Sequence, residues 1–211
     1  MAKIISTLFM ALDGVVEPGE DWHFPYFDDN MGAAVTEDYD AADTLLLGRV
    51  TYDSFAGAWP ERETAGDVDA TFAKQIGDMR KIVVSRERGR ELGWRNAEWL
   101  EGGLLQAVAA LKADPGTKGV LIPGSVSVVR QLLAAGALDE LRLLVHPVAA
   151  RRGVRLFDDG DTVYPFRVVR SDVYPTGVIR LIYVPAELPG STQYDDVKER
   201  VPHADEEPQQ G

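Results

Sequence analysis

Three short segments place glycine, serine, threonine or arginine directly after an apolar run. They are Gly48-Arg49-Val50-Thr51, Ser85-Arg86 and Gly124-Ser125-Val126. A glycine permits close approach to the backbone, a guanidinium beside a hydroxyl suits a phosphate group, and the start of a helix offers free amide N–H groups to an anion. Each segment alone is a weak signal, because surface arginines and turn serines are common. Their order predicts an extended ligand with several phosphates, such as a dinucleotide, along one sheet edge.

A fourth segment, Ala11-Leu12-Asp13-Gly14, follows the first apolar run. Asp-Gly forms a turn, and a turn stabilised by the aspartate side chain explains it without any ligand. The functional interpretation places the backbone of Ala11 and the carboxylate of Asp13 at the carboxyl ends of the strands, where open α/β sheets bind ligands. The sequence leaves both interpretations open.

Acidic and aromatic side chains crowd residues 13–29. The candidate proton donors are Asp13, His23, Tyr26, Asp28 and Asp29, with Asp13 and Asp28 retained as the catalytic pair. Trp22, Phe24 and Tyr26 would form the aromatic wall of a pocket for a planar heterocycle. A satellite apolar cluster beneath a long loop explains the same aromatic residues equally well.

Apolar periodicity predicts the elements that must position these groups. Strands are expected at residues 3–10, 44–47, 81–85, 120–122, 141–146, 166–173 and 178–184, and helices at 31–42, 67–79, 104–112 and 126–135, with a further helix after Thr51. Alternating strands and helices favour parallel pairing, and Tyr174-Pro175-Thr176-Gly177 indicates a closing hairpin. The predicted fold class is α/β, with a mixed, mostly parallel sheet and an antiparallel C-terminal hairpin.

Composition sets limits on the class of protein. The chain has 211 residues, no cysteine and a net charge of −12, which excludes a thiol nucleophile and disfavours nucleic-acid binding. Apolar runs are too short for a membrane span, so a cytoplasmic protein is expected. The three histidines lack ligand spacing, and no metal site is predicted, although folding could bring His23 and His146 together. We expect one domain at residues 1–186 and a disordered acidic tail at 187–211.

The motifs, in this order and spacing, resemble the dihydrofolate reductase-like superfamily. More closely, they resemble the C-terminal reductase domain of bifunctional riboflavin-biosynthesis deaminase-reductases, in a stand-alone form. The resemblance rests on Leu-Asp-Gly after the first strand, Leu-Leu-Leu-Gly-Arg-x-Thr-Tyr, Val-Val-Ser-Arg, Gly-Ser-x-x-x-Val and the block from Leu138 to Phe157. It spans about residues 3–184. Gly124-Ser125 stands where the family often has Gly-Gly, and residues 149–153 depart from its glycine-rich loop.

The resemblance implies a three-layer α/β fold and NADPH as cofactor. Gly48, Arg49 and Thr51 would hold the cofactor phosphates. Ser85 and Arg86 would bind the adenosine 2′-phosphate, and Gly124, Ser125 and Val126 would wrap the pyrophosphate or the nicotinamide ribose. The backbone at Ala11 would face the nicotinamide. A cis peptide bond is implied between Gly124 and Ser125.

The expected function is NADPH-dependent reduction of a small heterocyclic or imine substrate. The most concrete version is 5-amino-6-(5-phosphoribosylamino)uracil reduction in riboflavin biosynthesis, with Arg151, Arg152 or Arg155 on the substrate phosphate. The alternatives are dihydrofolate reductase-type activity and a non-catalytic dimeric nucleotide-binding protein. A homodimer is expected through edge pairing of the 141–146 strand and the hairpin.

Overall fold

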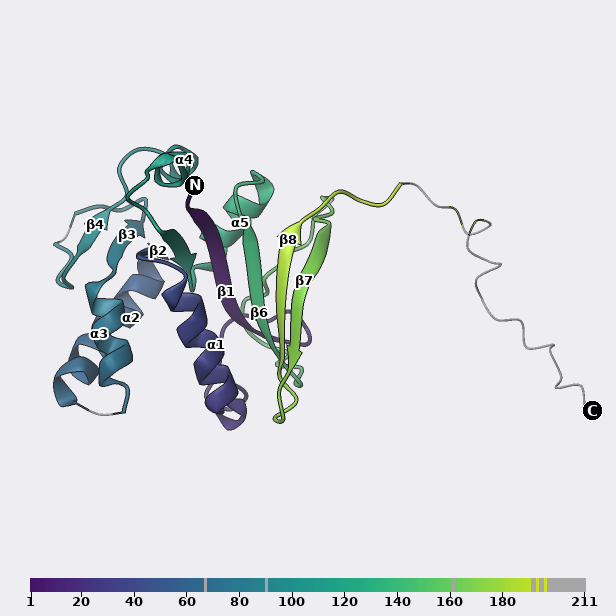
Figure 1. Ribbon diagram of the computed structural model, residues 1–211, viewed down its shortest axis with the longest axis horizontal. Helices are drawn as coiled ribbons and strands as arrows, with labels where there is room; N and C mark the ends of the chain where they lie inside the picture. The colour runs from purple at the N-terminus through teal and green to yellow at the C-terminus, as the bar shows by residue number, and fades with distance from the viewer. Residues whose placement is uncertain (67, 90, 161, 191–192, 194–195, 197–211) are drawn as a thin grey trace, which may run out of the picture.

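A single eight-stranded sheet organises the chain (Figure 1). The computed structural model describes residues 1–66, 68–89, 91–160, 162–190, 193 and 196. The strand order is β4-β3-β2-β5-β1-β6-β8-β7. The first six strands in this order are parallel, β8 runs antiparallel to β6, and β7 runs antiparallel to β8. This arrangement confirms the predicted mixed sheet with its antiparallel C-terminal hairpin.

The elements agree closely with the apolar patterns. The strands are β1 (Lys3–Ala11), β2 (Thr44–Gly48), β3 (Arg80–Val84), β4 (Ala97–Trp99), β5 (Gly119–Ile122), β6 (Glu140–His146), β7 (Phe166–Val173) and β8 (Ile179–Pro185). The helices are α1 (Asp29–Asp40), α2 (Arg49–Ala65), α3 (Ala70–Asp78), α4 (Leu104–Ala113) and α5 (Val126–Ala134), with a short 3₁₀ helix, η1, at Phe24–Tyr26.

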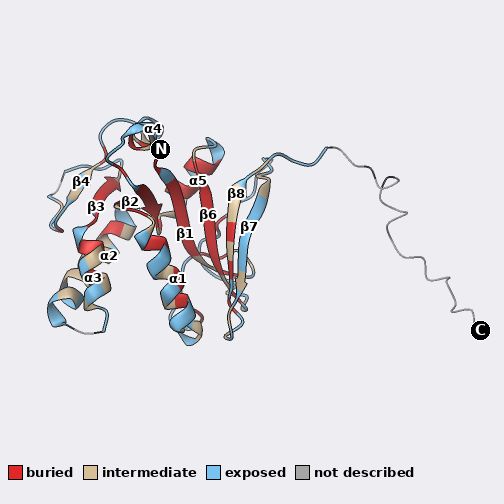
Figure 2. Cartoon of the chain, viewed as in Figure 1, coloured by how far each residue is buried: buried red, intermediate tan, exposed pale blue. Residues whose placement is uncertain are grey.

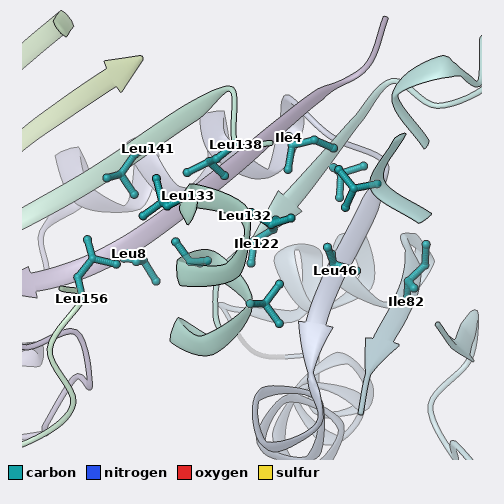
Figure 3. Close-up of a cluster of buried hydrophobic side chains, with 14 of the residues drawn as sticks. Ile4, Leu8, Leu46, Ile82, Ile122, Leu132, Leu133, Leu138, Leu141 and Leu156 are labelled. Atoms are coloured by element: carbon teal, nitrogen blue, oxygen red, sulfur yellow. The ribbon is translucent and has the colours of Figure 1, made fainter. Parts of the chain in front are cut away.

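Helices cover both faces of the sheet, and each face has its own core. One core joins β1, β2, β3, β5 and β6 to α4 and α5, and Figure 3 shows Ile4, Leu46 and Ile122 of this cluster beside Leu132 of α5. The other core joins β1, β2, β3 and β5 to α1, α2 and α3 through Tyr39, Tyr52 and Ile76. Figure 2 shows the central strands buried and β7 largely exposed. Burial on both faces explains why β2 and β5 are continuous apolar runs.

Two elements differ from the sequence prediction. The edge strand β4 was not predicted, because three residues that include the exposed Glu98 carry too little pattern. The predicted helix at 67–79 begins only at Ala70, and Val68, inside the predicted range, is 97% exposed. Residue 67 and most of the predicted acidic tail lie outside the described residues.

The predicted mode of dimer pairing through the strand at 141–146 is wrong. Strand β6 lies between β1 and β8, so both of its edges are already hydrogen-bonded. The sheet edge on this side belongs to β7. Any pairing between copies at this side must therefore use β7.

Candidate functional site

The carboxyl ends of β2 and β5 meet in a close contact between Gly48 and Ser125. A Cβ atom on Gly48 would lie 2.3 Å from Cβ of Ser125, and one on Gly124 would lie 3.0 Å from Oγ1 of Thr51. Gly124 has φ +152°, a conformation that L side chains rarely adopt, and its peptide bond to Ser125 is cis, as the resemblance implies. The two predicted segments therefore form one structural unit, which we call the cradle (residues 48–51 and 124–126).

Two helices begin in the cradle with their first amides uncapped by side chains. Gly48 is the N-cap of α2 and Ser125 is the N-cap of α5, and neither helix has a side-chain cap hydrogen bond or an acidic residue in its first turn. Helices α3 and α4 also lack such a cap, whereas in α1 the Asp28 carboxylate accepts a hydrogen bond from the Met31 amide at 2.9 Å. The feature that distinguishes α2 and α5 is that their N-termini meet at the contact between Gly48 and Ser125. The amides at the start of a helix need an acceptor. The cradle thus fits an anionic group.

The third predicted segment lies next to the cradle, at the end of β3. Gly48 is in register with Val84, so Ser85 and Arg86 follow on the neighbouring strand at the same sheet edge. The Ser85 hydroxyl accepts a hydrogen bond from the Glu87 amide at 3.0 Å and lies 2.7 Å from the Glu87 carbonyl oxygen. It therefore shapes a turn, which leaves the Arg86 side chain exposed. Arg49, at the start of α2, forms a partly exposed ion pair with Asp53 at 3.1 Å.

The predicted catalytic carboxylates both bind backbone amides. Asp13 accepts hydrogen bonds from the amides of Ala150 and Arg151 at 3.2 and 2.7 Å. The Arg151 amide is the main cause that lowers the pKa of Asp13. The side chain of Asn30, at 3.0 Å, and then the Met31 amide lower the pKa of Asp28. Both groups are thus held ionised, and each has a structural task beside the catalytic role predicted for it.

The loop that contains Asp13 is tied to the loop after β6. The Arg155 guanidinium donates to the Asp13 carbonyl oxygen at 3.0 Å, and Val15 and Arg155 form an isolated antiparallel bridge. Arg152 forms an exposed ion pair with Asp21 at 2.8 Å. Two of the three arginines predicted for a substrate phosphate, Arg152 and Arg155, therefore bind the loop after β1, at Asp21 and Asp13. These contacts hold the loops after β1 and β6 together over the carboxyl ends of the two strands.

The predicted aromatic wall surrounds a pair of histidines. Nδ1 of His23 lies 3.2 Å from Nε2 of His146, although the two residues are 123 positions apart. The rings of Trp22 and Tyr26 lie 5.0 and 5.9 Å from the His146 ring, whereas Phe24 is 62% exposed. His146 is in register with Ala11, so the pair adjoins the backbone predicted to face the nicotinamide. The sequence carries no spacing signal for this pairing, because a strand and a loop deliver the two rings.

Beyond the carboxyl edge, the structure was searched for cavities, metal sites and membrane-spanning helices. A hollow of about 430 Å³ beside α2 is lined by Tyr52, Asp53, Glu91 and Trp94, among others. Within the described part of the chain, no group of three or more histidine or acidic side chains could hold a metal ion. Among the same residues, no helix combines the length and apolar character needed to cross a membrane.

Known proteins resemble this chain in both sequence and structure. The uncharacterized protein YyaP of Bacillus subtilis (strain 168) is 30% identical over 184 residues, which cover 86% of this chain and 94% of YyaP. A crystal structure from Shewanella sp. PV-4, provisionally named a riboflavin biosynthesis protein, has a TM-score of 0.69 at 21% identity and covers 89% of this chain and 100% of its own.

Two further solved structures share the fold. A pyrimidine reductase-like protein from Corynebacterium diphtheriae has a TM-score of 0.61 at 17% identity, over 88% of this chain and 92% of its own. RibD of Acinetobacter baumannii has a TM-score of 0.59 at 14% identity, over 89% of this chain and 59% of its own. The family model described as RibD C-terminal domain matches residues 2–180. The chain therefore belongs to the RibD C-terminal domain family.

Proposed function

We propose that this protein is an NADPH-dependent reductase of a small heterocyclic or imine substrate. The observation that carries the proposal is the cradle, where two uncapped helix N-termini meet at Gly48 and Ser125. Membership of the RibD C-terminal domain family supports it. The name of the pyrimidine reductase-like neighbour points to the same reaction class.

Each part of the carboxyl edge has a task in binding the cofactor. The first amides of α2 and α5, with Arg49 and the Thr51 hydroxyl, hold phosphate oxygens, and Val126 continues the cradle. Arg86 binds the 2′-phosphate, and Ser85 shapes the turn that presents it. The backbone at Ala11 faces the nicotinamide. When bound, the cofactor supplies the hydride, and the protein supplies orientation and a route for the proton.

The substrate lies on the other side of Ala11, against the residues that surround the histidine pair. Tyr26 and the exposed Phe24 contact the plane of the heterocycle, and the buried Trp22 supports this wall by packing against the His146 ring. The exposed Arg151, with Arg152 and Arg155, holds a substrate phosphate. Asp13 and Asp28 remain the candidates for proton transfer. Reduction of a C=N or C=O group adds a hydride to carbon and a proton to nitrogen or oxygen. Because their lowered pKa values keep both carboxylates ionised, a water that is hydrogen-bonded to one of them and exchanges with solvent delivers that proton. The most concrete substrate is 5-amino-6-(5-phosphoribosylamino)uracil.

Three proposals concern the whole protein. The protein works in the cytoplasm, as a homodimer that pairs through the β7 side of the sheet. Residues 187–211 form an acidic tail outside the reductase domain of residues 1–186. Neither nucleic acid nor membrane is a partner, because the net charge of −12 opposes binding to other polyanions.

Cofactor binding and turnover test the proposed function directly. Purified protein is titrated with NADPH and NADH, and NADPH oxidation is followed with 5-amino-6-(5-phosphoribosylamino)uracil and with dihydrofolate. Arg86→Ala should weaken NADPH about ten- to a hundredfold and leave NADH unchanged, because a hydrogen bond to a charged group contributes about 1.5–3 kcal/mol. Arg62→Ala, the same charge change at the exposed C-terminal end of α2, is the matched control.

The outcomes separate the alternatives. Oxidation with dihydrofolate alone would favour the dihydrofolate reductase-type activity. Tight NADPH binding without turnover of either substrate would favour a nucleotide-binding protein without catalysis. Equal affinity for NADPH and NADH in the unmodified protein would overturn the role of Arg86.

A further inference from the structure

Two buried imidazoles connect residues 22–27, here called the aromatic segment, to the end of β6. His23 is 6% exposed and His146 is fully buried. Their rings are joined by the 3.2 Å contact between Nδ1 of His23 and Nε2 of His146. The partners come from η1's N-cap position and from the last residue of β6. This contact therefore fixes a loop to the sheet at the residue beside Ala11.

The hydrogen-bond directions follow from a backbone carbonyl. Nδ1 of His146 lies 3.0 Å from the carbonyl oxygen of Leu144, which can only accept a hydrogen bond. His146 therefore carries its proton on Nδ1, and its Nε2 accepts the hydrogen bond that His23 donates from Nδ1. The chain of hydrogen bonds ends at a carbonyl, which has no proton to deliver. The pair is built to position the two segments and not to relay protons.

The surroundings of the pair favour neutral imidazoles. The rings of Phe9, Phe24 and Phe27 lie 4.2, 5.0 and 5.7 Å from the His23 ring, and Trp22 and Tyr26 flank His146. Among these neighbours only Tyr26 has an ionisable group. The nearest carboxylates along the chain, Asp21 and Asp28, bind Arg152 and the start of α1. In the described residues, no hydrogen bond or ion pair brings a carboxylate to either imidazole. Burial lowers the pKa of His23 to about 4 and also lowers that of His146.

We propose that the His23–His146 pair is an acid-sensitive latch, which positions the aromatic segment over the carboxyl ends of β1 and β6 and releases it when an imidazole is protonated. A proton on either ring adds a charge to an aromatic cluster in which the described residues place no carboxylate; at His146 only the backbone carbonyls of Leu144 and Met10 favour it. A proton on Nε2 of His146 also removes the acceptor of the hydrogen bond. Other contacts hold the first part of the loop, because Asp13 and Asp21 bind residues 150–152. The latch therefore acts on the aromatic segment. Its consequence for substrate binding rests on the proposed function.

Trp22 reports the position of the aromatic segment without any cofactor or substrate. Its side chain is buried in the latched form, at 8% exposure. Acrylamide quenching of Trp22 is obtained as the difference between the unmodified protein and Trp22→Phe. We expect little quenching at pH 7.5 and at least a twofold increase in the quenching constant between pH 6.5 and 4, reversible on neutralisation. Far-UV circular dichroism verifies that the sheet and the helices remain folded.

Two substitutions of His23 separate the hydrogen bond from the ring. His23→Phe keeps an aromatic ring but loses the donor, and should expose Trp22 at pH 7.5 to the extent that the unmodified protein reaches only in acid. His23→Asn places an amide donor near the position of Nδ1 and cannot be protonated, so Trp22 should stay protected at pH 7.5 with a smaller acid response. If the protein reduces a substrate, His23→Phe should raise KM more than it lowers kcat.

The latch and the reductase activity can fail independently. Trp22 quenching that is unchanged between pH 7.5 and 4 would overturn the latch, as would His23→Phe with the quenching of the unmodified protein at pH 7.5. Either result could occur in a protein that oxidises NADPH. The expected quenching in a protein with no reductase activity would keep the latch and remove the proposed function.

Discussion

Gly48 is a glycine for a reason that the sequence did not show. Its motif, Gly-Arg-x-Thr, predicted a close approach of the backbone to a ligand. The structure gives a second reason, since a Cβ atom there would lie 2.3 Å from Cβ and 2.6 Å from Oγ of Ser125. Its backbone, at φ −67° and ψ 154°, would accept any residue. The constraint at position 48 is therefore the side chain of Ser125.

This constraint predicts a rescue by a second substitution. Gly48→Ala should separate β2 from β5 at the cradle, with a loss of about 1–3 kcal/mol of unfolding free energy and at least tenfold weaker NADPH binding. With Ser125→Gly added, the nearest remaining atom is Cα of residue 125 at 3.7 Å, an ordinary contact. Urea unfolding and NADPH titration of both single variants and the double variant test the cycle. A double variant as impaired as Gly48→Ala would contradict the packing argument.

His23 gives the stability of the protein a defined pH dependence. Its pKa falls from 6.5 to about 4 on folding, so above pH 6.5 both states are neutral and nothing changes. Below pH 6.5 the unfolded state binds the proton first, and stability falls until about pH 4, by about 3 kcal/mol in total. Urea unfolding from pH 7.5 to 4 should show a steeper loss in the unmodified protein than in His23→Phe. Parallel curves for the two proteins would contradict the assignment.

Helix α1 is fixed to the sheet by a buried carboxylate. Asp38 accepts hydrogen bonds from the Thr7 hydroxyl at 2.6 Å, from Arg142 at 2.7 Å and from Arg180 at 2.5 Å. These partners lie on β1, β6 and β8, and both Asp38 and Arg180 have side chains 1% exposed. A single residue thus connects the helix to three strands.

Removing this carboxylate should be costly. Asp38→Asn leaves Arg142 with Glu140 and Arg180 with Glu37 as the remaining counter-charges. Breaking a buried ion pair in this way costs about 3–5 kcal/mol. Asp29→Asn, at the exposed start of the same helix, is the matched control, with an expected change below about 1 kcal/mol. Thermal and urea unfolding measure both variants. A small effect of Asp38→Asn would show that water or Glu37, which binds Arg180 at 2.7 Å, replaces the carboxylate.

The elements were more predictable from the sequence than their contacts. Runs such as 44–47 and 120–122 are apolar because they are buried on both faces, and they were assigned within one residue at each end. The carboxyl edge of a parallel sheet then brought together the cradle and Ser85-Arg86 as expected. The pairing of His23 with His146 and the contact of Gly48 with Ser125 depend on tertiary register. No local pattern encodes either one.

At the scale of the whole molecule, the sheet has one long exposed border. Strand β7 is exposed along most of its length, with Val168 at 46%, Val169 at 47% and Val173 at 74% exposure. An uncovered edge strand with apolar side chains is prone to pair with another chain. We therefore place the interface of the proposed homodimer at β7, and not at β6 as the sequence predicted.

The dimer can be tested by a charge on this border. We expect analytical ultracentrifugation to show a dimer of the unmodified chain, and Val173→Glu to weaken association at least tenfold, because two copies of the strand would bring like charges together. Val68→Glu is the matched control, since Val68 is 97% exposed far from β7. An unmodified protein that sediments as a monomer at micromolar concentration would contradict the homodimer.

The chain enters and leaves the sheet at the amino ends of the parallel strands, at the opposite end from the cradle. Lys3 begins β1 in register with Gly119, the first residue of β5, and Tyr183 near the end of β8 is in register with Leu141 near the start of β6. Figure 1 shows the start of β1 and the end of β8 at the top of the view, while the strands of the parallel part point downward. A solid support or a fused protein joined through the residues before β1 would therefore lie on the opposite side of the molecule from the cradle, and the cradle would stay open to solution when the protein is immobilised.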